Sequence, residues 1–489
     1  MTFRDLAIGL SLANIVLIRA WFLAGGRGYF LSQLPVSRWY AGLLIDFGLL
    51  ALLLAGLSTW SRRRPASLRI SALLVAILLL PPLDWLLRHG AGVILADVAT
   101  SMGVTGAWLI AAAAAALVLL LRPLQLLLLR VLPVVALPLV FVTVPYSLMP
   151  SFVTPREVES AAAPEQRPVG AKVLWLLFDS LNQRTLTAAP GEVPPLPAFR
   201  QLMSESFVAT KAASPGDRTL TAIPSMTIGR VVASASAEQD SLSLRFADGG
   251  NGLWHEQDTV FHAVERMGYA TGAVGWYHPY CAVFNGVLDA CAWSPMDPPA
   301  NTVRAGMHRH AQDALGALSL VYRAGLDEVL FTASQIQGKR AQHAAAHRFL
   351  SGRAEAIALE MPAGLLLAHY PLPHEPAIGD LVVPRSGDWT GFYGNVVVAD
   401  RALASLRQRL EAEGKWNEFT VVVTADHVSL AMAAFGSEVP FIVKFSGLSQ
   451  PVIFDSPVSL VILRDLLPRL VSREIATPEQ LTAYLAARP

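Results

Sequence analysis

Five long apolar stretches in the first 150 residues most constrain how this 489-residue chain folds. Each stretch is near the roughly 20 residues that an α-helix needs to cross the hydrocarbon core of a bilayer. The composition agrees, because 53% of the residues are hydrophobic and only 15% are charged, which is unusual for a soluble domain. The sequence therefore predicts five membrane-spanning helices, approximately at Leu6–Ala24, Ala41–Leu57, Ile70–Leu87, Val104–Leu121 and Val131–Leu148.

The arginines of this region predict its orientation. Basic residues mark the cytoplasmic connections of membrane proteins. Arg62, Arg63, Arg64 and Arg69 lie between the second and third stretches, and two further arginines flank the connection between the fourth and fifth, Arg122 and Arg130. The expected protein is a multi-pass protein of the bacterial inner membrane, with its amino terminus inside and everything after the fifth stretch periplasmic or extracellular.

Charge and cysteine content exclude some classes of protein. The formal net charge of +1 gives no chain-wide basic surface, so nucleic acid is not an expected partner. Two cysteines cannot build a disulfide-rich scaffold or a four-thiolate metal site. Because the second part of the chain should face an oxidising compartment and no other thiol competes, we expect a disulfide between Cys281 and Cys291, with two buried free thiols as the alternative.

The sequence after the apolar region has the pattern of a linker and then of a globular domain. Residues 150–170 are rich in Pro, Ala and charged residues and have no helical or strand periodicity. From residue 171 to 489, short Leu-rich or β-branched runs alternate with amphipathic segments, which predicts an α/β domain with a mainly parallel sheet. The expected organisation is a transmembrane domain over residues 1–149, a linker over 150–170 and an extracytoplasmic globular domain over 171–489.

Four apolar runs of the second part are followed by polar residues capable of chemistry. In open α/β sheets, ligands bind beyond the carboxyl ends of the strands, so residues far apart in sequence converge there. The runs and their polar residues are Val173–Phe178 with Asp179, Thr271–Gly275 with His278, Leu365–Ala368 with His369 and His374, and Thr420–Ala425 with Asp426 and His427.

Three of these residues form a candidate metal site. Two carboxylates and an imidazole are the ligand set of a catalytic zinc, or of manganese if more oxygens join. We therefore expect Asp179, Asp426 and His427 to bind a divalent metal, although an Asp after a strand also commonly caps a helix. For His278 and His369 taken alone, a satisfied polar group is the stronger interpretation.

Five segments resemble, in order, the signatures of the sulfatase branch of the alkaline-phosphatase superfamily. They are VLWLLFDSL at 173–181, TLTAIPSMTIGR at 219–230, GYATGAVGWYH at 268–278, LLLAHYPLPHEP at 365–376 and FTVVVTADH at 419–427. The apolar first region is similar to the membrane anchors of phosphoethanolamine transferases and lipoteichoic acid synthases of this branch. The resemblance implies an alkaline-phosphatase-like fold and assigns Asp179, Asp426 and His427 to metal-binding positions.

The nucleophile segment departs from the sulfatases. Sulfatases require Cys or Ser two residues before the proline of this motif, and that position here is Ala222, so sulfate hydrolysis through formylglycine is excluded. The phosphoethanolamine transferases place Thr five residues before the proline, which is Thr219 before Pro224. The resemblance thus implies that Thr219 is the nucleophile and a metal ligand, with Thr221 as the runner-up and a substrate-binding candidate.

The resemblance also assigns roles to three histidines. His374 matches the His of the Pro-His-x-Pro element, and either His374 or His278 would protonate the departing alcohol or activate the acceptor. His369 is a weaker, substrate-binding candidate. Two departures concern the substrate: the usual Lys of the third motif is absent, and Val428 and Ser429 replace the Gly-Glu that usually follows the metal-binding Asp-His.

These assignments predict a phosphotransferase. It would move a phospho-headgroup, of phosphoethanolamine or phosphoglycerol type, from a membrane phospholipid to an envelope glycan or glycolipid through a phosphothreonine intermediate. Zinc is the expected metal, with manganese, magnesium or calcium as alternatives. Two other functions remain open: a phosphoester hydrolase that uses the same site, and a catalytically inactive, lipid-sensing membrane protein.

Overall fold

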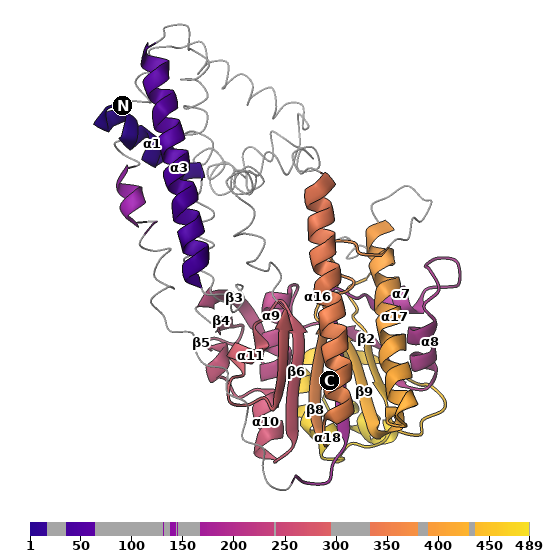
Figure 1. The fold of residues 1–489 in the computed structure, drawn as a ribbon. Helices are drawn as coiled ribbons and strands as arrows, with labels where there is room; N and C mark the ends of the chain where they lie inside the picture. Colours follow the sequence, from indigo (N-terminus) through magenta and orange to yellow (C-terminus); the bar gives the residue numbers. More distant parts are fainter. Residues whose placement is uncertain are drawn as a thin grey trace, which may run out of the picture. The chain divides into compact units, whose positions relative to one another are not determined.

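The computed structural model describes residues 1–16, 36–63, 131, 137–142, 144, 167–238, 241–294, 333–379, 390–429 and 436–488 (Figure 1). The chain divides into two compact units. The first comprises Met1–Pro155 and Asp297–Ile336, and the second comprises Arg156–Met296 and Gln337–Pro489. Each unit is described by itself.

The first unit contains two helices that pack on each other, α1 (Phe3–Val16) and α3 (Val36–Arg63). Gly9 permits their close approach, because a Cβ there would lie 2.2 Å from the main-chain oxygen of Ala51. The interface also holds polar groups. The Asp5 carboxylate is fully buried and accepts hydrogen bonds from Ser58 Oγ at 3.1 Å and from the Thr2 main-chain N–H at 2.7 Å.

The expectation of a five-helix transmembrane region is wrong. Among the residues that the structure describes, no helix is both long and apolar enough to cross a membrane. The same finding contradicts the expected multi-pass, inner-membrane localisation.

Parts of that expectation lie outside the described residues. The predicted stretches Ile70–Leu87 and Val104–Leu121 fall there entirely, and only a few residues of Val131–Leu148 are described. The predicted linker at 150–170 is described only from Arg167 onwards.

The second unit is built on an eight-stranded sheet with the strand order β11-β2-β10-β9-β1-β8-β6-β7. Strand β10 runs antiparallel to both of its neighbours, and the other pairs are parallel. The predicted α/β domain with a mainly parallel sheet is thus confirmed. The strands are β1 (Lys172–Phe178), β2 (Phe207–Ala213), β6 (Ala270–Trp276), β7 (Ala290–Ser294), β8 (Gly364–Tyr370), β9 (Phe419–Ala425), β10 (Phe441–Lys444) and β11 (Val452–Ser459).

Helices cover both faces of this sheet, which explains why its central strands are apolar along their whole length. Strands β6 and β8 are buried at every residue. Helices α16 and α17 lie in front of the sheet in Figure 1, and α18 lies behind it. The covering helices are α8 (Pro197–Ser204), α9 (Thr219–Ile228), α10 (Val260–Arg266), α16 (Ala333–Glu360), α17 (Thr390–Ala412), α18 (Leu463–Val471) and α19 (Pro478–Ala486).

A smaller antiparallel sheet follows α9 in the chain. It contains β3 (Val232–Glu238), β4 (Ser241–Phe246) and β5 (Asn251–Leu253) in that order. Two short helices lie in the connections after β1 and β6, namely α7 (Gln183–Thr187) and α11 (Tyr280–Val283).

Candidate metal centre

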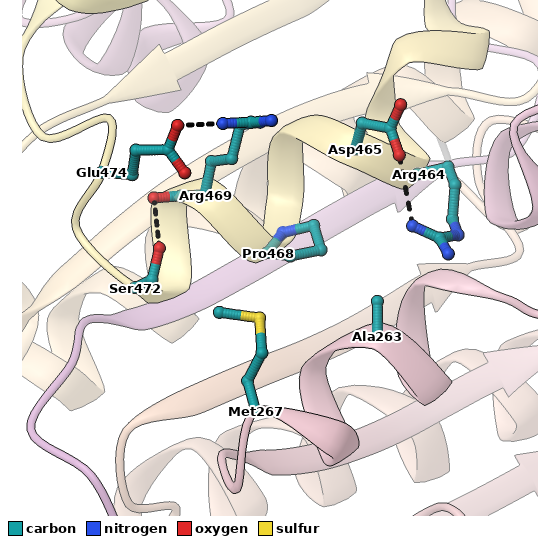
Figure 2. A pocket seen from close by; sticks show the side chains of 8 residues that line it. All are labelled: Ala263, Met267, Arg464, Asp465, Pro468, Arg469, Ser472 and Glu474. Carbon is teal, nitrogen blue, oxygen red and sulfur yellow. Dashed lines mark hydrogen bonds and ion pairs between the residues drawn. The ribbon is translucent and has the colours of Figure 1, made fainter.

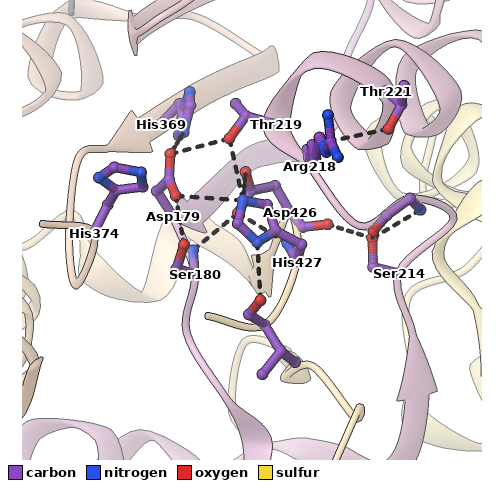
Figure 3. A network of polar contacts seen from close by, with 12 residues as sticks. Asp179, Ser180, Ser214, Arg218, Thr219, Thr221, His369, His374, Asp426 and His427 are labelled. Atoms are coloured by element: carbon purple, nitrogen blue, oxygen red, sulfur yellow. Dashed lines mark hydrogen bonds and ion pairs between the residues drawn. The ribbon is translucent and has the colours of Figure 1, made fainter. Parts of the chain in front are cut away.

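The carboxyl ends of three adjacent parallel strands bring the predicted acids together. The register of the sheet pairs Phe178 at the end of β1 with Tyr370 of β8 on one side and with Ala425 of β9 on the other. Asp179 and Asp426 directly follow these paired residues, so they leave the sheet at the same level. Figure 3 shows both acids with His427 at the centre of a network of polar contacts.

Asp179, Asp426 and His427 form a compact cluster of potential metal ligands. Each offers a ligand atom, and these atoms lie within 4.8 Å of one another. The His427 Nε2 atom lies 3.4 Å from Asp426 Oδ2 and 3.8 Å from Asp179 Oδ1. Both carboxylates are 0% exposed. Two buried carboxylates at this separation repel each other, so a cation between them would stabilise the arrangement.

The hydrogen bonds of Asp426 fit a bound divalent cation. Its Oδ1 accepts from the main-chain N–H groups of Ser180 and His427, both at 2.9 Å. Its Oδ2 is buried and accepts no hydrogen bond. A buried carboxylate oxygen without a donor is costly, and it lies in a set of two carboxylates and one imidazole. That donor set suits zinc, or manganese with additional oxygen ligands.

The pKa shifts of the cluster reflect the same repulsion between its two carboxylates. Burial raises the pKa of Asp426, and the nearby Asp179 carboxylate raises it further. Burial also favours the neutral form of Asp179, but His374, His369 and His427 outweigh it and hold the pKa of Asp179 below its ordinary value. For His427, burial lowers the pKa, but Asp426 and Asp179 outweigh burial and raise it. A proton and a metal cation would therefore compete with each other for the negative charge of Asp179 and Asp426.

Thr219 lies at this cluster, at the first residue of α9. Its Oγ1 is 3.3 Å from His427 Nε2 and 3.4 Å from Asp179 Oδ2. The side chain is 6% exposed. The N-cap residue Arg218 provides no side-chain cap, and a helix amino terminus favours negative charge. Thr219 thus presents a hydroxyl to the metal ligands at a position that also suits a phosphoryl group.

Thr221 lies elsewhere. Its Oγ1 donates to the main-chain oxygen of Arg218 at 3.3 Å, and it packs near Gly216. In Figure 3 it lies beyond Arg218 from the two acids. The structure brings Thr219, and not Thr221, to the cluster.

His278 contacts the backbone of Thr219 rather than its hydroxyl. The His278 Nε2 atom is 3.0 Å from the Thr219 carbonyl oxygen. The ring is fully buried, with its edge against Trp254 at 4.9 Å between ring centroids. Burial lowers the pKa of His278 to about 3, so the ring is neutral and donates to that carbonyl. This is the contact of a positioning residue.

His369 lies inside β8 and not beyond its end. Its Nε2 is 3.6 Å from Asp179 Oδ2, and its Nδ1 is 2.8 Å from the hydroxyl of Tyr280. Burial, with Asp426 and Asp179, raises the pKa of Tyr280 well above its ordinary value. The phenol therefore keeps its proton and donates it to Nδ1, which leaves the Nε2–H of His369 facing Asp179.

His374 is a partly exposed imidazole among the predicted site residues. It lies in the loop after β8. Its Nδ1 is 2.6 Å from the carbonyl oxygen of Glu375, so Nδ1 carries the hydrogen and Nε2 is the acceptor. Figure 3 shows its ring beside Asp179, and its ring centroid is 5.1 Å from that of Trp276. A substrate atom at the cluster could exchange a proton with His374.

The sequence did not indicate several residues of this site. Ser180 donates to both acids, and Tyr280 donates to His369. His343 of α16 is buried with its ring 5.4 Å from that of Trp276. A serine after a strand and a histidine in an Ala- and Gln-rich helix match no motif. No local sequence pattern could therefore have identified Ser180 or His343.

Cys281 and Cys291 form a disulfide that links α11 to β7, the pairing that the sequence predicts. The bond holds the residue after Tyr280 against the strand next to β6. It thereby fixes the segment from which Tyr280 reaches His369.

A separate pocket of about 230 Å³ lies between α10 and α18 (Figure 2). Its two arginines already face carboxylates: Arg464 contacts Asp258 and Asp465, and Arg469 contacts Glu474. None of the predicted site residues lines this pocket.

No protein-family model and no curated protein sequence matches the chain. Solved structures do resemble it. The phosphonate monoester hydrolase of Agrobacterium radiobacter is 14% identical, with a TM-score of 0.40 over 62% of this chain and 73% of that chain. An alkaline-phosphatase-superfamily protein from Vibrio parahaemolyticus is 15% identical, with a TM-score of 0.39 over 64% and 69% of the two chains. The PsFucS1 sulfatase from Pseudoalteromonas sp. is 13% identical, with a TM-score of 0.40 over 62% and 68%.

One of these structures is a sulfatase and another is named as a member of the alkaline-phosphatase superfamily, the group whose signatures the five sequence segments resemble. The sequence identities and TM-scores of these structures are low, so they carry no argument about function. The residues of the metal centre support the function proposed next.

Proposed function

We propose that this protein is a metal-dependent enzyme that transfers a phospho-group through a covalent intermediate on Thr219. The observation that carries the proposal is the position of the Thr219 hydroxyl, 3.3 Å from His427 Nε2 and 3.4 Å from Asp179 Oδ2 at the amino terminus of α9. A nucleophile beside metal ligands and a helix amino terminus is suited to attack on phosphorus.

A phosphoester resists attack because the incoming oxygen meets negative charge. A divalent cation held by Asp179, Asp426 and His427 would neutralise that charge and favour loss of the hydroxyl proton of Thr219. The polar cluster itself keeps Thr219 in place, because His278 holds its carbonyl. The positive end of the α9 dipole adds to the stabilisation of the phosphoryl oxygens.

The reaction has two halves. In the first, Thr219, whose hydroxyl proton has passed to solvent, forms a bond from Oγ1 to phosphorus, the bond from phosphorus to the leaving oxygen breaks, and that oxygen takes the Nε2 proton of a doubly protonated His374. In the second, an acceptor hydroxyl gives its proton to His374 Nε2 and attacks phosphorus, and the Thr219 oxygen leaves. His374 is assigned this role because its Nδ1 is already occupied by the Glu375 carbonyl and its ring is accessible.

The proposed donor is a phosphodiester of the phosphoethanolamine or phosphoglycerol type, and the proposed acceptor is a glycan hydroxyl. The support for transfer is the spacing of Thr219 to Pro224, which resembles that of the phosphoethanolamine transferases. If water is the acceptor, the same two half-reactions amount to hydrolysis.

Trapping the intermediate tests the proposal. The purified protein is incubated with Zn²⁺ or Mn²⁺ and bis(p-nitrophenyl) phosphate, quenched in acid and digested for mass spectrometry. We expect a nitrophenylphospho-group on Thr219, no nitrophenol release by Thr219→Ala, and release close to wild type by the matched variant Thr221→Ala. Modification of Thr221, or robust turnover by Thr219→Ala, would contradict the assignment.

A second measurement separates transfer from hydrolysis. A phosphodiester donor with a labelled headgroup is supplied with and without an oligosaccharide. We expect label on the oligosaccharide, whereas label only on the water-released phosphoester would identify a hydrolase. A protein that binds no Zn²⁺ or Mn²⁺ would point instead to an inactive member of the fold.

A further inference from the structure

Ser180 connects the two acids of the metal centre. Its main-chain N–H donates to Asp426 Oδ1 at 2.9 Å, and its Oγ–H donates to Asp179 Oδ1, also at 2.9 Å. The residue is 3% exposed. In Figure 3 it lies directly below the two carboxylates. One residue therefore holds one oxygen of each acid, through two different donors.

The backbone of Ser180 adopts an unusual conformation to make these contacts. Its φ is +70°, in the left-handed region that residues other than glycine seldom adopt. The turn directs the N–H of Ser180 sideways from β1 towards β9, while its side chain folds back onto the preceding residue. Such a conformation is strained for a residue with a side chain, so the two contacts that it provides must offset that strain.

The two hydrogen bonds turn the other oxygen of each acid towards the remaining residues of the cluster. Asp179 Oδ2 faces Thr219 and His369 at 3.4 and 3.6 Å. Asp426 Oδ2 is buried without a donor, 3.4 Å from His427 Nε2. Rotation of either carboxylate away from this orientation would lose a contact with Ser180.

We propose that Ser180 is a positioning residue that fixes the orientation in which each of the two acids presents an oxygen to the divalent cation. The inference rests on the metal centre of the proposed function. Hydrogen bonds to ligating carboxylates orient them, and their removal typically weakens metal affinity about 10- to 100-fold.

Two substitutions separate the hydroxyl from the backbone. Ser180→Ala and Ser180→Gly both remove the Oγ–H donor and keep the N–H, but only glycine adopts φ of +70° without strain. We expect Zn²⁺ affinity, measured by competition with a chromophoric chelator, to fall about 10- to 100-fold in both variants. With Co²⁺ in place of Zn²⁺, we expect altered visible absorption bands in both, because the carboxylate coordination changes.

The matched control is Ser206→Ala. Ser206 is also buried, but its Oγ–H donates to the Leu202 carbonyl. It precedes the amino end of β2, whereas Ser180 lies beyond the carboxyl end of β1. We expect it to lower the stability of the metal-free protein and to leave Zn²⁺ affinity unchanged. Wild-type affinity in both Ser180 variants, or in Ser180→Gly alone, would overturn the role of the hydroxyl while leaving the metal centre intact. Failure of the wild-type protein to bind Zn²⁺ and Mn²⁺ would overturn the proposed function as well.

Discussion

At the scale of single residues, Asp426 shows why the metal centre lowers the stability of the protein when no cation is bound. Its side chain is fully buried, one of its oxygens lacks a donor, and burial with the neighbouring Asp179 raises its pKa. The two main-chain hydrogen bonds to its Oδ1 offset only part of the cost of burying this charge. The negative charge of Asp426 therefore stabilises the site only when a cation is bound.

Asp426→Asn should separate metal binding from folding. The amide oxygen can still accept from the N–H groups of Ser180 and His427, and the repulsion with Asp179 disappears. We expect the melting temperature of the metal-free variant to equal or exceed that of the wild type. A wild type at Zn²⁺ 100-fold above its Kd gains about 2.7 kcal/mol, and the variant should lose this gain. Thermal unfolding with and without Zn²⁺ measures the melting temperature of the metal-free protein and the stabilisation by Zn²⁺. A variant that Zn²⁺ still stabilises fully would contradict the ligand assignment.

Residue types at strand ends could be predicted, but their contacts could not. Asp179 and His427 stood out because each follows an apolar run. The preference for Thr219 over Thr221 rested on the spacing to Pro224, and helix geometry supplies the physical reason, since two residues on a helix differ by about 200° in direction. Ser180 was not predicted, because its role depends on a left-handed backbone that no neighbouring residue signals.

At the scale of elements, strand β6 supports the site through its glycines. A Cβ on Gly275 would lie 2.1 Å from Cε2 of Tyr280, so the absence of a side chain there lets the Tyr280 ring pack on the strand and reach His369. A Cβ on Gly272 would lie 3.0 Å from a terminal methyl of Leu366, which can shift.

Gly275→Ala should therefore displace Tyr280, whereas Gly272→Ala serves as the matched control on the same strand. Overpacking typically costs about 1–3 kcal/mol, and we expect this loss of unfolding free energy for Gly275→Ala, together with weaker metal binding because His369 loses its partner. For Gly272→Ala we expect a smaller loss and unchanged metal affinity. Urea unfolding and Zn²⁺ titration check both, and equal effects from the two variants would show that the Tyr280 contact is unimportant.

Element boundaries explain one difference between expectation and structure. The apolar run Leu365–Ala368 suggested a strand that ends before His369, but β8 continues to Tyr370. Pairing with β1 on one side and β6 on the other decides where β8 ends, and local composition does not record such pairing.

At the scale of the whole molecule, two buried histidines and one half-buried histidine tie stability to pH. Burial lowers the pKa of His278 to about 3 and those of His343 and His347 to about 4. In the unfolded chain the same imidazoles take up protons near pH 6.5. The unfolded state then binds more protons than the native state, so stability falls as the pH falls from about 6.5 towards 4.

The slope should reflect the number of these imidazoles. Each contributes up to about 1.4 kcal/mol per pH unit in that window. We expect His347→Gln to reduce the dependence of the unfolding free energy on pH by about one proton, as measured by urea unfolding of the metal-free protein between pH 7 and pH 5. His255→Gln is the control, because its side chain lies outside this set. An unchanged slope in His347→Gln would mean that the native protein already protonates His347.

The largest error of the sequence analysis also belongs to this scale. The prediction of five spans counted apolar residues in windows of about 20. It could not anticipate that α1 and α3 would bury Asp5 and Ser58 against each other. Hydropathy measures composition, whereas the partner of a helix is a property of the fold.

The position of β1 in the sheet has a consequence for how the chain is made. This strand leaves the ribosome first among its neighbours, and its two partners, β8 and β9, begin only at Gly364 and Phe419. At ordinary rates of synthesis the wait is on the order of tens of seconds. During that time six apolar residues of β1 have neither sheet partner, and such a segment pairs readily with other chains. The yield of folded protein should therefore depend on how well the cell shields one short segment of a half-made chain.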